Sequence, residues 1–173
     1  SLGKTMEDGR TQMVGLLLPS DFIGRPGRET IDFDVVAVTD VTLCCFHRKP
    51  FEALIETTPH IAQRLMEMAL DELDAARDWM LLLGRKTARE KIATFIEMLV
   101  RRQQLTIADA MDQELVLPLT RHEIANYLGL TLETVSRQLG AMKKERIVQF
   151  VDRRRFRVTD LEALHVASGD DCP

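Results

Sequence analysis

Residues 119–144 read LTRHEIANYLGLTLETVSRQLGAMKK, and two short helices are expected here with a glycine turn between them. Thr120, followed three residues later by Glu123, forms a capping box that marks the start of the first helix. Gly129 suits the turn because glycine adopts positive φ without strain. Thr131 is the expected N-cap of the second helix. Two capped helices around a glycine turn predict a helix-turn-helix.

A hairpin of two strands is expected directly after the second helix. Between the strand-like runs Val148–Val151 and Phe156–Val158, residues 152–154 form a polar turn sequence. Leu115–Leu119, which precedes the first helix, also has the composition of a short strand. Thr159, with a glutamate three residues later, predicts the cap of a last short helix. The segment as a whole predicts a winged helix-turn-helix.

The second helix, from Leu132 to about Lys144, has an apolar and a polar face. Residues at spacings of three and four are expected to face the core: Leu132, Val135, Leu139 and Met142. The opposite face offers these polar side chains: Glu133, Thr134, Ser136, Arg137 and Lys143. In a helix-turn-helix the N-terminal half of the second helix contacts base edges, so these residues are the expected DNA contacts.

The chemistry of this face suits base recognition. Arg137 can donate two hydrogen bonds to the O6 and N7 of guanine, and Glu133 can accept one from the amino group of cytosine. Ser136 can contact a base or a neighbouring phosphate. The alternative is an ordinary exposed helix face, in which Glu133 and Arg137 pair with each other one turn apart.

The distribution of charge supports a polyanion-binding part. The chain has a formal net charge of −4, yet residues 117–158 contain nine basic side chains and only four acidic ones. The basic residues outside the second helix that we expect to contact the phosphate backbone or the minor groove are Arg121, Arg153, Arg154, Arg155 and Arg157. Such contacts position a domain on DNA without reading sequence.

Residues 58–84 are expected to form one long helix, with Thr58 as N-cap and Gly84 as C-cap. One apolar stripe along it consists of Met66, Ala69, Leu73, Ala76, Met80 and Leu83. A second stripe consists of Ile61, Leu65, Met68, Ala75, Trp79 and Leu82. Two stripes predict that one packs on the chain itself while the first forms a parallel homodimer seam. The alternative is a helix buried on two sides within one chain.

The remaining segments complete an α+β fold. Residues 1–57 are expected to hold strands, with a turn at Glu7–Arg10, runs at Met13–Leu18 and Val35–His47, and a short helix at Pro50–Glu56. Residues 87–104 form a further helix, which starts at a capping box of Thr87 and Glu90 and presents Ala88, Ile92, Phe95, Ile96 and Leu99 to the core. The expected domains are residues 1–57, 58–84 and 85–173.

Composition excludes several classes of protein. The chain of 173 residues has neither an apolar run of transmembrane length nor a signal peptide, so we expect no membrane association and a cytoplasmic location. The cysteines are Cys44, Cys45 and Cys172, which form no CxxC motif and argue against a disulfide framework or a zinc ribbon. No glycine-rich phosphate loop or nucleophile elbow is present, so no enzymatic activity is expected. The chain starts at Ser1, and we interpret it as a fragment.

These features together resemble the Crp/Fnr family of bacterial transcription regulators: part of a β-roll, a long dimerisation helix and a winged helix-turn-helix. Leu130–Arg137 is similar to the recognition segment of the FNR subgroup, whose signature is Glu-x-x-Ser-Arg. The resemblance implies that Glu133, Ser136 and Arg137 read TTGAT-type half-sites of a palindrome, one in each half bound by a homodimer. It also implies contact with RNA polymerase, for which the loop 105–113 is the candidate.

The resemblance raises two cofactors for consideration. Cyclic-nucleotide members carry a Gly-Glu-Leu turn and a later arginine motif, which Phe22–Pro26 and Phe33–Val36 lack, so a cyclic nucleotide is not expected. FNR-type members hold a 4Fe–4S cluster, and Cys44 matches the position of the β-roll cysteine that ligates it. This role is conditional on N-terminal cysteines that the chain does not contain, so no cluster is expected in this chain alone.

Other interpretations of the cysteines and of the function stay open. A small buried apolar residue is the competing interpretation of Cys44, and Cys45, on the opposite strand face, is expected in the core. Some members with the same DNA-reading motif have no cluster, and Cys45 with His47 would suit haem or redox-thiol chemistry instead. A dimerisation adaptor without DNA binding is the alternative from a different class.

Overall fold

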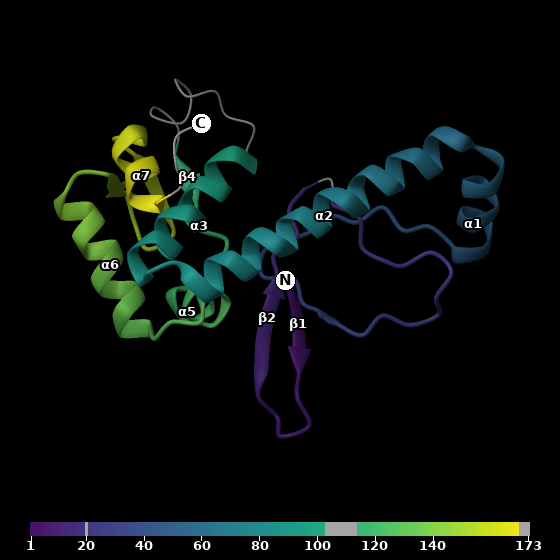
Figure 1. The fold of residues 1–173 in the computed structure, drawn as a ribbon, viewed down its shortest axis with the longest axis horizontal. Coiled ribbons are helices and arrows are strands. Elements are labelled where there is room, and N and C mark those ends of the chain that lie inside the picture. Colours follow the sequence, from purple (N-terminus) through teal and green to yellow (C-terminus); the bar gives the residue numbers. More distant parts are fainter. Residues whose placement is uncertain (20, 103–113, 170–173) are drawn as a thin grey trace. The chain divides into compact units, whose positions relative to one another are not determined.

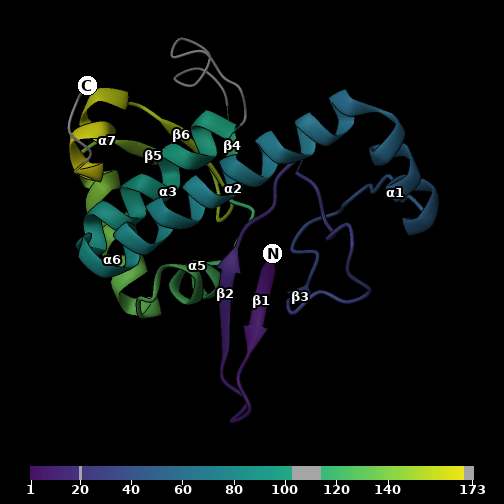
Figure 2. The same ribbon diagram turned by 45° about the vertical axis from the view of Figure 1, so that its right-hand side comes forward.

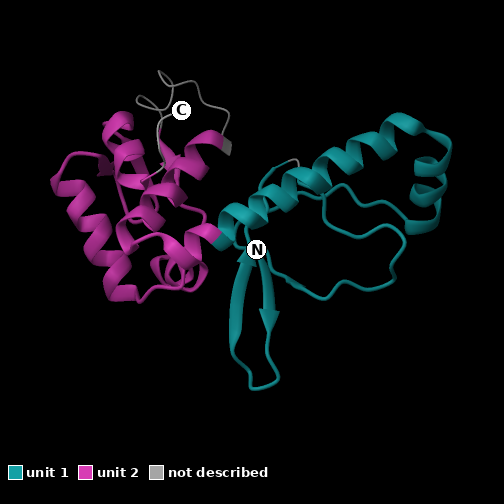
Figure 3. Cartoon of the chain, viewed as in Figure 1, with its two compact units in different colours: residues 1–80 teal, residues 81–173 magenta. Residues whose placement is uncertain are grey.

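The computed structural model describes residues 1–19, 21–102 and 114–169 (Figure 1). The chain forms two compact units, residues 1–80 and residues 81–173, and the boundary falls inside one helix (Figure 3). The expected division into three domains therefore stays a prediction. Residues 105–113, the expected loop for polymerase contact, and Cys172 lie outside the described residues.

The first unit starts with an antiparallel hairpin of β1 (Leu2–Thr5) and β2 (Thr11–Gly15). Its turn carries Gly9 at a φ of 83°, so the predicted turn at Glu7–Arg10 is confirmed. The short strand β3 (Asp34–Val35) pairs with the other edge of β1, which gives the strand order β2-β1-β3. The short helix expected at Pro50–Glu56 is present as α1 (Arg48–Thr57).

Two strand predictions in this unit were too long. Val35–His47 was expected as a strand, but β3 covers only Asp34 and Val35. The strand expected over Met13–Leu18 starts earlier and ends at Gly15. A β-branched composition favours extended backbone, but a strand forms only where a neighbouring edge supplies hydrogen bonds. For β3 that edge is two residues long, Leu2 and Gly3 of β1.

The long helix α2 (Pro59–Arg85) is continuous through the unit boundary. The prediction of a helix over residues 58–84 is therefore confirmed to within one residue. Gly84 was expected to be the C-cap, but the helix passes through it, and its φ is not positive. The described helices are not long and apolar enough to cross a membrane.

The second unit combines four helices with a small antiparallel sheet among its described residues. The helices are α3 (Ala88–Arg102), α5 (Arg121–Leu128), α6 (Leu132–Lys144) and α7 (Leu161–Ser168). The strands are β4 (Leu115–Val116), β5 (Val148–Phe150) and β6 (Arg155–Val158). The sheet order is β4-β6-β5, so the expected wing hairpin is extended by β4 as a third strand (Figure 2). The α+β class and the winged helix-turn-helix are confirmed.

The core of this unit is built from one face of each helix. Helix α3 packs against α7 and α6, and four of its five expected core residues are fully buried: Ile92, Phe95, Ile96 and Leu99. Residues Val135, Leu139 and Met142 of α6 are buried as predicted, but Leu132 is 42% exposed. Leu132 is the first residue of its helix, where no preceding turn covers it. Each buried aliphatic side chain contributes about 1.5–3 kcal/mol through removal from water.

The last helix starts one residue later than the capping pattern predicted. The N-cap of α7 is Asp160, whose carboxylate accepts a hydrogen bond from the Ala163 backbone at 2.8 Å. Thr159, the expected cap, instead donates its hydroxyl to the carbonyl of Arg146. Both residue types are common N-caps, but only the aspartate accepts from the new helix.

Candidate nucleic-acid interface

The first helix of the helix-turn-helix is fixed at both ends. The Thr120 backbone donates to Glu123 Oε2 at 2.6 Å, and the Glu123 backbone donates to Thr120 Oγ1 at 3.3 Å, which confirms the predicted capping box. Gly129 closes the helix in the left-handed conformation, at φ 62° and ψ 41°, with its N–H aimed at the Ala125 and Asn126 carbonyls. The turn therefore requires the conformation that glycine adopts most readily.

The carboxylate of Glu123 in the capping box interacts electrostatically with Arg154 of the wing. Burial would raise the pKa of Glu123, but hydrogen bonds from Thr120 and the nearby Arg154 and His122 outweigh it, so the pKa lies below its ordinary value. The carboxylate is therefore ionised at neutral pH. It lies at the positive end of the α5 dipole, which it complements.

The second helix presents its polar face to solvent. Thr131 caps α6 by accepting a hydrogen bond from the Thr134 backbone at 3.2 Å, as predicted. Glu133 and Arg137 are exposed, while Thr134 and Ser136 are half-buried beside them. The structure thus brings the predicted base-contacting residues together on the first two turns of α6.

The described structure does not contain the alternative, an internal ion pair between Glu133 and Arg137 on an ordinary exposed helix face. Among the described residues, Glu133 and Arg137 make no ion pair with each other and no side-chain hydrogen bond with any other group. Both functional groups are therefore available to an external partner. Arg121, at the start of α5, and Lys143, near the end of α6, are also exposed and without a partner in the described part of the chain.

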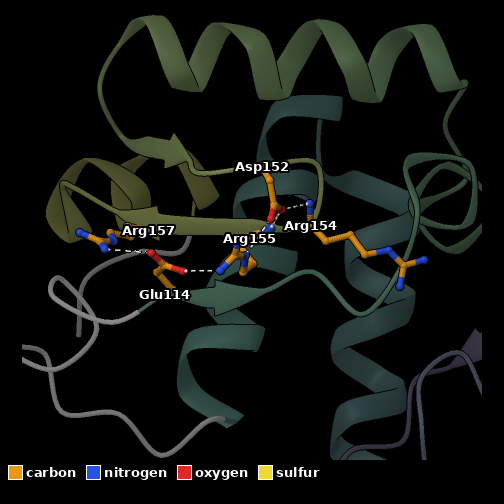
Figure 4. A network of polar contacts seen from close by, with 5 residues as sticks. All are labelled: Glu114, Asp152, Arg154, Arg155 and Arg157. Carbon is orange, nitrogen blue, oxygen red and sulfur yellow. Dashed lines mark hydrogen bonds and ion pairs between the residues drawn. The ribbon is translucent and has the colours of Figure 1, made fainter.

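The wing arginines, by contrast, fall into two groups (Figure 4). The carboxylate of Asp152 accepts from the Arg154 backbone at 2.8 Å and from the backbone and Nε of Arg155, both at 2.7 Å. Glu114 lies beside β6 and pairs with Arg155 at 3.3 Å and with Arg157 at 2.9 Å. These interactions hold the pKa of Asp152 near 2 and raise the pKa of Arg155. Arg155 and Arg157 are thus already neutralised within the wing.

Two wing arginines are left for an external anion. The side chain of Arg154 points away from the other residues of the network in Figure 4, and it has no ion pair among the described residues. Arg153 is exposed and likewise unpaired there. Sequence reasoning placed all wing arginines in one class because it missed Glu114 and Asp152 as internal partners. An aspartate two residues before Arg154 is the pattern of a side-chain-stabilised turn, and it was a usable signal.

The predicted dimer seam is uncovered in the single chain. All six of its residues are exposed, with Met66 at 67% and Met80 at 66%. On the second stripe, Leu82 is buried, Ala75 is exposed and the other members are half-buried. The described part of the chain therefore covers the second stripe far more than the first, which disagrees with a helix buried on both sides within one chain.

The cysteines do not form a cofactor site by themselves. Cys44 and Cys45 are both exposed, so the expected core position of Cys45 was wrong, as was the alternative of a buried Cys44. Among the described residues, no three histidine, cysteine or acidic side chains converge closely enough to hold a metal ion. A 4Fe–4S cluster takes four cysteine ligands, and the three cysteines of this chain do not fit that requirement.

Comparison with known proteins agrees with this architecture. The family model of the Crp-like helix-turn-helix domain matches residues 60–166. The transcriptional activator protein FnrL of Cereibacter sphaeroides is 57% identical over 99% of this chain and 70% of its own length. The nitrogen fixation regulation protein FixK of Bradyrhizobium diazoefficiens is 40% identical over 87% of this chain, a match that covers 62% of FixK.

A solved structure is also similar to this chain in its fold. FixK2 of Bradyrhizobium japonicum superimposes with a TM-score of 0.80 at 31% identity, over 99% of this chain and 83% of FixK2. These relatives are transcription regulators and not enzymes, in agreement with the sequence. With its helix-turn-helix, its wing and these relatives, the chain belongs to the Crp/Fnr family of transcription regulators, in the group of FNR- and FixK-type activators.

Proposed function

We propose that this chain binds palindromic DNA as a homodimer and reads each half-site with Glu133, Ser136 and Arg137. The observation that carries the proposal is the state of α6: the carboxylate of Glu133 and the guanidinium of Arg137 are exposed and have no partner in the described chain. A contact between such residues one helical turn apart stabilises an exposed helix by only about 0.2–0.5 kcal/mol, so it competes weakly with an external partner. Leaving both groups free suits an external hydrogen-bonding partner.

Each residue has a distinct part in this recognition. The fork of Arg137 matches the O6 and N7 acceptors of guanine, and Glu133 accepts from the amino group of cytosine. Ser136 and Thr134, half-buried at the edge of the face, suit contacts to a base or a nearby phosphate. The resemblance to the FNR subgroup favours half-sites of the TTGAT type.

The phosphate contacts are assigned to the basic residues that lack an internal ion pair. These are Arg121, Lys143, Arg153 and Arg154. Arg155 was in the same predicted set, but its guanidinium is bound by Asp152 and Glu114, so we assign it mainly to holding the wing. Each phosphate neutralised by a free cation contributes to affinity and to its salt dependence.

Dimerisation is assigned to the exposed stripe of α2. Apolar residues at spacings of three and four on one exposed face are the pattern of a coiled-coil seam. A two-fold dimer presents its two recognition helices to two half-sites of a palindrome. The symmetry of the site would then mirror the symmetry of the protein.

The test is fluorescence anisotropy on a TTGAT–ATCAA palindrome and on a scrambled duplex of equal length. Arg137→Ala should lower the discrimination between the two by about 1–3 kcal/mol. Lys144→Ala is the matched control, because it removes one positive charge from the same helix outside the predicted base contacts. Equal binding of wild-type protein to both duplexes would refute sequence recognition, and equal effects of the two variants would refute the role of Arg137.

The input to the regulator is proposed separately. Relatives named transcriptional activators favour activation as the outcome of DNA binding. On the resemblance to the FNR subgroup alone, the proposal includes oxygen or redox state as the signal, contact with RNA polymerase and a cytoplasmic location. Cys44 would be a cluster ligand only together with cysteines outside this chain. A redox-thiol sensor is the second candidate, favoured by the exposure of both Cys44 and Cys45. Iron analysis of anaerobically purified protein distinguishes the two.

A further inference from the structure

The C-terminal end of the recognition helix is tied to the start of α3 by an ion pair. Arg89 donates from one guanidinium nitrogen to Glu145 Oε1 at 3.0 Å and from the other to Oε2 at 2.5 Å. The two residues are 56 positions apart in sequence, and Glu145 is the C-cap of α6. This bidentate geometry fixes the relative orientation of the guanidinium and the carboxylate as well as their separation, whereas a single hydrogen bond fixes only the separation. It also raises the pKa of Arg89 and lowers the pKa of Glu145.

A second residue of α3 holds the other helix of the motif. The ammonium of Lys91 donates to the carbonyl of Leu128, the last residue of α5, at 3.3 Å. Lys91 is only 9% exposed, and because lysine is rarely buried without a partner, the hydrogen bond to Leu128 accounts for its burial. A cation at the carbonyl end of a helix also complements the helix dipole. The first turn of α3 therefore contacts the ends of both α5 and α6.

The end of α6 is otherwise closed by backbone contacts. Ile147 donates to the Met142 carbonyl and Arg146 to the Lys143 carbonyl, with Arg146 in the left-handed conformation at φ 60°. This is a Schellman motif in which an arginine occupies the position that glycine favours. It fixes the helix end locally, whereas Arg89 is the side chain that ties this end to another helix by an ion pair.

We propose that Arg89 and Glu145 are positioning residues for DNA recognition: their ion pair, together with Lys91, sets the angle at which α6 enters the major groove. The proposal rests on the proposed function. Helix α6 has 13 residues, so it is about 20 Å long, and a tilt of about 3° at its C-terminal end moves its N-terminal end by about 1 Å. Base-reading hydrogen bonds tolerate errors of about 0.5 Å. A contact remote from the bases therefore controls selectivity.

The test exchanges the charges of Arg89 and Glu145 and measures the preference of each variant for the palindrome over the scrambled duplex. Arg89→Glu, Glu145→Arg and the double variant are compared for binding to the TTGAT–ATCAA palindrome and to the scrambled duplex. Net charge predicts opposite effects of the two single variants on scrambled DNA: Arg89→Glu weakens binding and Glu145→Arg strengthens it. If the ion pair positions α6, both single variants should lower the ratio of palindrome affinity to scrambled-duplex affinity by roughly fivefold to tenfold. The double variant should recover the wild-type ratio.

Arg10→Glu on the β1–β2 hairpin is the matched control, because it reverses an exposed arginine that also sits in an ion pair. It should leave the affinity ratio within about twofold of wild type. The proposal is overturned if the single variants change binding to both duplexes by the same factor, or if the double variant does not recover selectivity.

Hydrogen exchange separates this proposal from the function on which it rests. Backbone amides of residues 143–147 should exchange faster in Arg89→Glu and return to the wild-type rate in the double variant. If wild-type protein does not prefer the palindrome, the proposed function fails, and the exchange rates still decide whether Arg89 fixes the end of α6. Unchanged exchange in Arg89→Glu would reject the positioning role whatever the DNA data show.

Discussion

Asp152 binds Arg155 twice, through the backbone N–H and through Nε, both at 2.7 Å. The same carboxylate accepts the backbone N–H of Arg154 at 2.8 Å, so one side chain shapes the wing turn and neutralises one of its arginines. The neighbouring Arg154 keeps a guanidinium without an ion pair in the described chain. Adjacent arginines of the same wing therefore have different electrostatic states.

This difference predicts how the wing variants respond to salt. Arg153→Ala and Arg154→Ala should each reduce the slope of log affinity against log salt by about 0.9 for every phosphate that the variant no longer neutralises. Arg155→Ala and Arg157→Ala should change the slope much less, since Asp152 and Glu114 already neutralise those groups. Anisotropy titrations over a series of salt concentrations measure the slopes. Equal changes for all these variants would contradict the division of the wing arginines.

The wing turn should resist acid. The pKa of Asp152 is about 2 in the folded protein against an ordinary value of 3.8. A lowered folded-state pKa means that the contribution of this group to stability is complete above its ordinary value and is lost as pH falls towards the folded-state value. NMR signals of the Arg154 and Arg155 amides should keep their native shifts at about pH 4 and lose them near pH 2. Titration of these amides around the ordinary pKa of aspartate would contradict the hydrogen-bond network.

The capping box of α5 should also make stability depend on pH. Thr120→Ala should lower the free energy of unfolding by about 1 kcal/mol, because the Glu123 amide loses its partner. The lowered pKa of Glu123 gives a contribution that is present above its ordinary value of 4.5 and lost at lower pH. Chemical denaturation at neutral pH and at about pH 3 measures both effects. A Thr120→Ala penalty of equal size at both values would argue against coupling to the carboxylate.

Two glycines of the helix-turn-helix provide a matched pair. Gly129→Ala should destabilise the protein by about 1–2 kcal/mol, because the residue must adopt φ 62°. Gly140→Ala should stabilise it by about 0.5–1 kcal/mol, since Gly140 lies inside α6 and an added Cβ would meet nothing within 4 Å. Thermal unfolding gives both values. The same sign for the two variants would show that the backbone conformation does not decide the effect.

Local sequence signals predicted the DNA-binding unit well for a physical reason. Its caps, glycine turn and apolar spacing are short-range features, and Thr120, Gly129 and Thr131 all act within a few residues of themselves in the structure. Leu132 shows the limit of periodicity, because spacing alone does not tell whether the first turn of a helix is covered. The expected strand at Val35–His47 failed because strand pairing depends on a distant edge.

The candidate site was predictable in its residue types but not in its internal pairing. Spacing on α6 identified Glu133 and Arg137, yet it could not decide between an internal ion pair and two free groups. The partners of Arg155 are Asp152 and Glu114, and Glu114 is 41 residues away in sequence. Local patterns could not identify Arg89 for the same reason: its partner Glu145 becomes a neighbour only when α3 packs on α6.

The exposed stripe of α2 predicts the effect of one charge in the seam. Ala76→Glu places two like charges opposite each other in a parallel dimer, and it should shift the chain towards monomer in sedimentation velocity. Ala75→Glu is the control, because Ala75 is also exposed but lies on the second stripe. The control variant should keep the dimer at the same protein concentration. An unaltered dimer in Ala76→Glu would place the interface elsewhere, whereas loss of the dimer in both variants would point to a general effect of charge on α2.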